Sequence, residues 1–226
     1  MRARATAVVA AATLLSVNTS GADRTAWAQT APAGPVLTVT ATKVTATGMT
    51  PGGGVVWLGM ARRIETYEPI YVRRHGIVQA DAKGQAELPV TEAVPRHSIW
   101  LAVDLKTGAY ATASPAGFAP LAFTLSPEAL ELRGAALADR LIDTADYGEV
   151  LLVRPGKGAW GKAVGHGGLD DESATGEAVV KVAFDKLLPV PGTVEPAPAK
   201  LSAKDLVVVL HPRAMAIAAV TFEAKP

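Results

Sequence analysis

The stretch QADAKGQAELPV, residues 79–90, decides the fold class predicted for this chain. A polar segment ends at Gly84, and tight turns use glycine readily because it adopts positive φ without steric cost. Ala86, Leu88 and Val90 then follow at every second position, which is the period of a strand with one buried face. The stretch therefore predicts the corner of a β-hairpin.

Similar short apolar runs, separated by Gly and Pro, recur along the sequence. Residues 98–114 and 205–223 each hold two such runs around a short connection, as β-hairpins do. The Pro-rich segment 188–200 is expected to be an exposed loop without regular hydrogen bonding. These patterns predict an all-β fold. The other expected strands lie within 36–42, 43–61, 68–81 (one strand, or two around Gly76), 86–90, 121–135, 149–156 and 176–184.

One segment, SPEALELRGAALADRLI at 126–142, is open to two interpretations. Ser126 and Pro127 are typical of the start of a helix. Gly134 argues against a helix that continues through it, because glycine costs about 1 kcal/mol relative to alanine in a helix interior. We expect a strand over 129–133, with room for a short helix after Gly134.

The two halves of the chain repeat one apolar pattern. Gly84 matches Gly176 at an offset of 92, which makes Leu88 correspond to Val180, and the closing hairpins match at about 107. A spacing near 90 residues suits β-sandwich modules of about 100 residues. Chance similarity is the alternative, because apolar alternation repeats easily in all-β chains. At an offset of 86, Leu37, Val39, Val44, Ala46 and Gly48 correspond to Phe123, Leu125, Leu130, Leu132 and Gly134.

Three stretches carry a resemblance to known proteins: VTATGMTPGGGVVWL (44–58), DAKGQAELPV (81–90) and the closing hairpin (98–114). Together they resemble bacterial extracytoplasmic immunoglobulin-like modules. The resemblance implies two tandem immunoglobulin-like β-sandwich domains, at 36–114 and 119–226, with a boundary near 114–118. One larger sandwich is the alternative. Members of this broad class serve in adhesion, in carbohydrate contact or as spacers, and the resemblance assigns no functional residue.

The N-terminus is typical of a secretory signal peptide over residues 1–28. Basic residues precede the apolar run 5–17, which is shorter than the roughly 20 residues that span a bilayer. Cleavage fits after Ala28, in the A-x-A pattern of AWA, or after Ala22, in SGA. An uncleaved N-terminal anchor is the alternative. We expect a periplasmic or secreted protein with no integral membrane segment after cleavage.

Charge and cysteine content exclude few functions. The chain has no Cys, so an exported form must be stabilised by its cores alone. Removing residues 1–28 takes three Arg and one Asp from the 22 basic and 21 acidic residues, which leaves a net charge of −1. A nucleic-acid or anionic-membrane partner would favour a basic balance, and we expect neither.

A catalytic alternative rests on two short motifs. YVRRHG, which contains His75, resembles the Arg-His-Gly motif of histidine phosphatases, and AVGHGG, which contains His166, resembles that family's second histidine motif. The resemblance implies that His75 accepts a phosphoryl group whose charge Arg73 and Arg74 offset. That family alternates strands with helices, whereas this interval is predicted to be mainly strands. The hydrolase is therefore the alternative to a non-enzymatic role.

No cofactor, metal site or catalytic residue is predicted. The acidic stretches 81–85 and 170–177 lack the alternating oxygen ligands of a calcium site. The 4 His residues have no paired spacing, and without Cys a zinc site is poorly supported. No G-x-S-x-G elbow is present for Ser-His-Asp catalysis.

Aromatic residues beside basic ones give a binding role more support. Tyr67 and Tyr71 lie among arginines in RRIETYEPIYVRR. Trp160, in a Gly-rich stretch, is expected either to offer a stacking platform or to fold back over the sandwich edge, whereas Trp57 and Trp100 are expected in the core. We therefore predict an exported, non-enzymatic binding, adhesion or structural module of the cell envelope, whose partner is an unidentified envelope protein or glycan. The candidate binding patch is Arg62, Arg63, Tyr67, Tyr71, Arg73, Arg74 and Trp160.

Overall fold

The computed structural model describes residues 27–29, 34–65, 68–90, 94, 98–114, 123–133, 148–164, 179–211 and 216–223. Within these ranges the chain forms antiparallel strands and one 3-10 turn, Phe184–Lys186, but no α-helix. The all-β class is therefore confirmed. The chain divides into two compact units between Phe118 and Ala119. No helix in the described ranges is long and apolar enough to cross a membrane.

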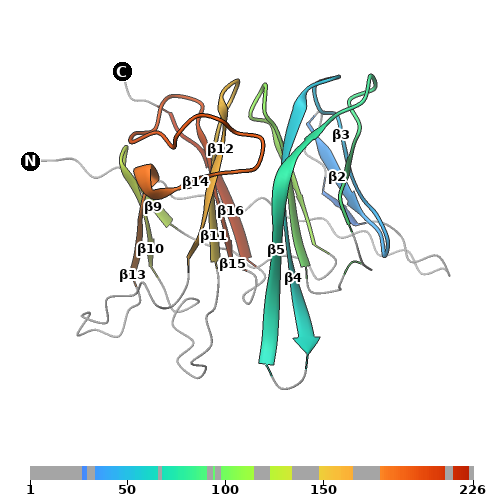
Figure 1. Ribbon diagram of the computed structural model, residues 1–226, viewed down its shortest axis with the longest axis horizontal. Coiled ribbons are helices and arrows are strands. Elements are labelled where there is room, and N and C mark those ends of the chain that lie inside the picture. The colour runs from blue at the N-terminus through green and yellow to red at the C-terminus, as the bar shows by residue number, and fades with distance from the viewer. Residues whose placement is uncertain are drawn as a thin grey trace, which may run out of the picture. The chain divides into compact units, whose positions relative to one another are not determined.

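The first unit, which ends at Phe118, contains two antiparallel sheets (Figure 1). One sheet has the order β1-β2-β3-β6 and the other the order β5-β4-β7-β8. The strand predicted at 68–81 is continuous, because its pairing with β4 runs unbroken through Gly76. The strands are β1 (Trp27–Gln29), β2 (Val36–Val39), β3 (Val44–Thr47), β4 (Gly54–Glu65), β5 (Glu68–Gln79), β6 (Ala86–Leu88), β7 (Ser98–Asp104) and β8 (Tyr110–Ala113).

Both sheets of the first unit contribute to one hydrophobic core. Alternate residues of β2 and β3, such as Leu37 and Val44, are fully buried in it. Trp57 and Trp100 from the other sheet join the same core, and each is 5% exposed. The Trp100 Nε1–H donates to Ser98 Oγ at 2.9 Å, which satisfies the polar group of a buried indole. The prediction of both tryptophans as core residues is confirmed.

The turn predicted within 79–90 is closed by the Asp81 side chain. Its Oδ1 accepts hydrogen bonds from the backbone N–H groups of Lys83 at 2.8 Å and of Gln85 at 2.9 Å. A carboxylate that bonds its own backbone two residues on is a common turn device. The bonds from Gln85 and Lys83 hold the pKa of Asp81 below its ordinary value. The predicted structural role of this acidic residue is confirmed.

Gly84 ends the turn in a conformation that requires glycine. Its φ is +74°, and a Cβ atom at this position would collide with the carbonyl oxygen of Met49. The Met49 N–H donates to the Gly84 carbonyl oxygen at 3.0 Å, so two backbone segments meet here. Ala86 and Leu88 of β6 follow and are each 1% exposed. The predicted buried face is confirmed at these two residues, and Val90 is partly buried against the same core.

The second unit, which begins at Ala119, also contains two antiparallel sheets. Their orders are β13-β10-β9 and β14-β12-β11-β15-β16 (Figure 1). Residues of both sheets meet in one core that includes Trp160 and Phe184. The strands are β9 (Phe123–Leu125), β10 (Ala129–Arg133), β11 (Gly148–Arg154), β12 (Gly158–Val164), β13 (Val179–Ala183), β14 (Leu188–Pro189), β15 (Leu206–His211) and β16 (Ala216–Thr221).

The strands of the two units pair in the same order. The series β2-β3-β6 in the first unit has the counterpart β9-β10-β13 in the second, and β5-β4-β7-β8 has the counterpart β12-β11-β15-β16. The predicted strand at 129–133 is confirmed as β10. The second unit differs by the added strand β14, and the first by the added strand β1.

The register corrects one detail of the sequence comparison. Val44 pairs with Leu88 in the first unit, and its counterpart Leu130 pairs with Val182 in the second. Leu88 therefore corresponds to Val182, and the predicted match to Val180 is wrong by two residues. Alternate residues share one face of a strand. Shifting the alignment of the two strands by two residues therefore still matches apolar residues with apolar residues, and the sequence pattern alone does not distinguish the two alignments.

The Pro-rich segment 188–200 is partly regular, contrary to the prediction. Leu188 and Pro189 form β14, opposite Gly161 and Trp160 of β12, and the Val190 N–H donates to the Ala159 carbonyl oxygen at 2.9 Å. Proline is tolerated here because β14 is an edge strand, where one side of the backbone needs no partner.

Some predictions fall outside the described residues. These are most of the signal peptide, the short helix after Gly134, the acidic stretch 170–177 and the turn inside 205–223.

Candidate functional site

Most of the predicted binding patch lies on the β-hairpin formed by β4 and β5. The cross-strand register places Arg62 opposite Tyr71, although these residues are well separated in sequence. Directly opposite residues of an antiparallel pair have Cβ atoms about 4.5–5.5 Å apart, so the register makes these two residues neighbours in the hairpin. The patch residues in these strands are Arg62, Arg63, Tyr71, Arg73 and Arg74, and Tyr67 lies outside the described residues.

The hairpin of β4 and β5 extends beyond the end of β7, the strand on the other side of β4. The pairing of β4 with β7 ends at Ala61 opposite Ser98, whereas its pairing with β5 continues to Glu65 opposite Glu68. Residues 62–65 and 68–71 therefore form a two-stranded ribbon, called the arm below, which no third described strand joins. In Figure 1 β4 and β5 are the longest arrows and run side by side toward the bottom of the view.

The outer edge of β5 has no described strand beside it, since β5 is the last described strand of its sheet. The Ala80 N–H donates to the Gly53 carbonyl oxygen at 2.9 Å, so the even-numbered position 80 faces β4. Residues of an antiparallel strand alternate, which turns the backbone groups of odd-numbered residues to the outer edge. Pro69 belongs to this odd-numbered set, where its missing N–H removes no bond to β4.

Trp160 does not belong with the hairpin residues. It lies in β12 of the second unit and is 1% exposed. Its Nε1–H donates to the Glu195 carbonyl oxygen at 2.7 Å, under the Pro-rich segment. A buried indole offers no face on which a ligand could stack, so of the two roles predicted for Trp160 the structure favours packing.

The two histidines of the phosphatase alternative are not brought together by the described residues. His75 lies in β5 opposite Leu58, and His166 lies outside the described ranges. Between the two motifs the described residues form strands and no α-helix. The hydrolase therefore remains an untested prediction. No group of three or more His, Asp or Glu residues in the described ranges is arranged to hold a metal ion.

The structure shows two polar clusters that the sequence patterns did not predict. The first is built on Asp104, 2% exposed, at the end of β7. Its Oδ2 accepts hydrogen bonds from the Thr50 N–H at 2.6 Å and from Thr50 Oγ1 at 2.7 Å. Burial raises the pKa of Asp104, but the bonds from Thr50 and from the turn N–H groups of Lys106 and Thr107 outweigh it, and the pKa lies below its ordinary value. The cluster fixes a turn and shows no reactive group.

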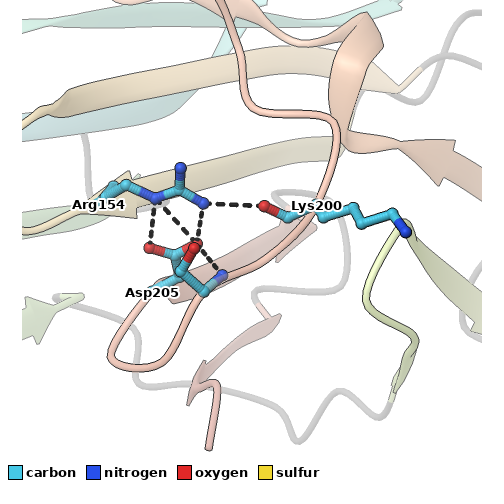
Figure 2. A network of polar contacts seen from close by, with 4 residues as sticks. Arg154, Lys200 and Asp205 are labelled. Atoms are coloured by element: carbon cyan, nitrogen blue, oxygen red, sulfur yellow. Dashed lines mark hydrogen bonds and ion pairs between the residues drawn. The ribbon is translucent and has the colours of Figure 1, made fainter. Parts of the chain in front are cut away.

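The second cluster joins the end of β11 to the segment before β15 (Figure 2). Asp205 is fully buried, and its oxygens accept bonds from Arg154 Nε at 2.9 Å and Nη2 at 2.7 Å and from the Ser202 N–H at 2.7 Å. Arg154 Nη2 also donates to the Lys200 carbonyl oxygen at 2.8 Å. The bonds to Asp205 raise the pKa of Arg154 further. A charge beside each continuous apolar run, at Arg154 and at Asp205, is the sequence signal that could have indicated this pair.

Comparison with known proteins gives no further guide to the site, since no protein-family model matches the chain and no curated protein shows significant similarity to it.

Proposed function

We propose that the protein is an exported, non-enzymatic binding module of the bacterial cell envelope and that the arm carries its binding surface. The observation that carries the proposal is that the arginine-rich segments 62–65 and 68–74 lie in β4 and β5, and that the pairing of these two strands continues past the end of the pairing between β4 and β7. Arg and Tyr are enriched in binding surfaces because both combine apolar area with hydrogen-bonding groups.

Two tandem immunoglobulin-like sandwiches are the architecture proposed for this module. The same order of paired strands in each unit supports it, as does a separate hydrophobic core in each. Sandwich modules of about 100 residues have this organisation.

Export is supported by the N-terminal sequence. Of the two candidate cleavage sites, after Ala22 and after Ala28, the strand β1 favours the first. Trp27–Gln29 pairs with β2, so cleavage after Ala28 would remove most of a strand from its sheet. Cleavage after Ala22 leaves the strand whole. We expect sequencing of the exported protein to give a mature N-terminus at Asp23, and a start at Gln29 would contradict this assignment.

The binding proposal is tested by removing the charge of the hairpin. We expect the variant with Arg62, Arg63, Arg73 and Arg74 all changed to Ser to bind isolated native cell envelopes at least tenfold more weakly than the wild type. Circular dichroism of the purified variant checks that it folds as the wild type does. Equal binding of variant and wild type would contradict the proposal.

A matched control removes the same charge from the second unit. Lys157, Lys162, Lys181 and Lys186 are exposed, and changing all of them to Ser is expected to leave envelope binding unchanged. A similar loss of binding in both variants would mean that net charge, and not the position of the charges on the hairpin, is responsible.

A further inference from the structure

Most edges of the described sheets carry a feature that discourages the addition of a further strand. Proteins protect their edge strands by shortness, proline, charge or a covering element. β8 has four residues and lies close to β1 and β2 of the other sheet in its unit. β1, β6 and β9 have three residues each, β14 has two and ends in Pro189, β5 contains Pro69, and β13 carries the exposed Lys181.

The strand β16, which is the counterpart of β8 in the second unit, lacks these features. Its sequence, AIAAVT, has six residues and contains neither proline nor a charged residue. It is the last described strand of its sheet, at the opposite end from β14. Thr221 is exposed, and Ile217 and Ala219 are partly exposed. The described part of the second unit therefore has an uncharged edge of the kind that readily pairs with another strand.

The pairing of β16 with β15 fixes which of its backbone groups face outward. The Phe222 N–H donates to the Asp205 carbonyl oxygen at 2.7 Å, so position 222 faces β15. Backbone groups alternate between the two sides of an antiparallel strand, so the even-numbered residues of β16 bond β15 and the odd-numbered residues face outward. The outward residues Ile217, Ala219 and Thr221 form an evenly spaced series of donors and acceptors.

This series is suited to pairing with a second copy of itself. In a two-fold antiparallel arrangement centred on Ala219, Ala219 lies opposite the partner's Ala219 and Ile217 lies opposite the partner's Thr221. All three outward residues then find main-chain partners, because positions 217 and 221 are equally far from the centre. The opposing side chains are uncharged, so the like-charge contacts that destabilise a pair of strands do not arise.

The other edge of the same sheet limits the assembly to two copies. β14 has two residues, of which one is Pro189, so that edge offers little to a further strand. A two-fold contact uses the same edge in both copies and closes on itself. The pairing would join two five-stranded sheets into one continuous sheet.

We infer that β16 is a self-association edge, through which two copies of the chain form an antiparallel dimer centred on Ala219. The uncharged edge has no side chain that would select a foreign strand by charge, whereas a second copy presents a series of backbone groups that matches by symmetry. This inference goes beyond the proposed binding function and is independent of it, because it uses residues of the second unit alone.

The first test is sedimentation velocity of the full mature chain over a range of concentrations. We expect a concentration-dependent equilibrium between monomer and dimer. A chain that stays monomeric up to its solubility limit would overturn the inference. Oligomers that keep growing with concentration would also overturn it, because a two-fold contact through one edge cannot form them.

Two substitutions of Ala219 test whether this edge is the interface. Ala219→Pro removes an outward N–H and no bond to β15, and we expect the dimer to dissociate at least tenfold more readily, because each copy loses a donor at the centre. Ala219→Lys places like charges opposite each other, and we expect at least a threefold effect. Dimers that neither substitution weakens would overturn the inference.

Val194→Lys is the matched control for added charge. Val194 lies in the same unit and is 94% exposed, and we expect its substitution to leave dimerisation unchanged. Equal weakening by Val194→Lys and Ala219→Lys would show that net charge is responsible, and would reject β16 as the interface.

Mixing two charged variants tests the two-fold register. Ala219→Lys or Ala219→Asp alone places like charges opposite each other, whereas a mixed dimer places opposite charges there. We expect the equal mixture to dimerise more tightly than either variant alone, and a mixture that is no tighter would overturn the inference. Circular dichroism checks the folding of each variant, and if Ala219→Pro does not fold, the charged variants decide the question.

Discussion

At the scale of single residues, Gly84 shows how one backbone conformation holds two segments together. Its φ of +74° and its close approach to Met49 both exclude a side chain. We expect Gly84→Ala to lower the free energy of unfolding by about 1–3 kcal/mol, because an alanine here is strained and also displaces the Met49 carbonyl. Urea unfolding measures this.

Gly52 provides the matched control for this substitution. It has φ +66°, but a Cβ atom placed on it would meet no other atom within 4 Å. Gly52→Ala therefore carries the conformational strain without the collision, and we expect it to cost about 1 kcal/mol. Equal losses in the two variants would show that the contact with Met49 does not matter.

Asp104 makes stability depend on pH in a defined direction. Its pKa is lowered in the folded state, so its bonds from Thr50 contribute fully at pH values above the ordinary carboxylate pKa of about 3.9 and are lost as the pH falls through the folded pKa. We expect the unfolding free energy of the wild type to fall more steeply from about pH 5 to about pH 3 than that of Asp104→Asn.

Thr50→Val tests the cause of this pH dependence. It removes the hydroxyl that donates to Asp104 at 2.7 Å and keeps the backbone donor at 2.6 Å. We expect an intermediate slope. A slope equal to that of the wild type would assign the effect to the remaining backbone donors alone.

At the scale of structural elements, the ion pair between Arg154 and the buried Asp205 connects β11 to the start of β15. Removing one partner of a buried pair leaves an uncompensated charge, and Asp205 is fully buried. We expect Arg154→Met to lower the free energy of unfolding by about 2–4 kcal/mol. The double variant with Asp205→Asn is expected to recover part of this loss, which a double-mutant cycle from denaturant unfolding would measure. Additive losses would contradict the coupling.

The strands themselves could be predicted because alternation is visible in one sequence. Leu37, Leu88 and Leu130 all lie at positions where every second residue is apolar, and all are buried. The turn at Gly84 could be predicted from turn chemistry. The correspondence of Leu88 with Val182 could not, because register depends on pairing between strands that are distant in sequence.

The parts of the site that were missed depend on tertiary contacts. The Gly-rich composition around Trp160 suggested a loop, but the residue pairs with Pro189 across a sheet edge and is buried. The candidate arginines could be found as a cluster in sequence. The sequence could not predict that their hairpin extends beyond the end of β7. Where β7 ends relative to β4 depends on how the two strands pair, and neither strand's own sequence gives this.

At the scale of the whole molecule, the separate cores predict separate folding. The cluster around Trp57 and Trp100 and the cluster around Trp160 and Phe184 share no residue. We expect thermolysin to cleave the native chain first near Phe118 and both fragments to keep their β-sheet circular dichroism. Early cleavage inside either core, or a fragment that unfolds when released, would favour one larger sandwich.

The central claim is that the arm is the binding element of the protein. It is tested most directly by replacing residues 62–71 with Asn-Gly, which joins the paired residues Ala61 and Val72 by a two-residue hairpin turn. The account predicts at least a tenfold loss of binding to native cell envelopes, with the midpoint of thermal unfolding nearly unchanged. Undiminished binding by the folded, shortened protein would contradict it.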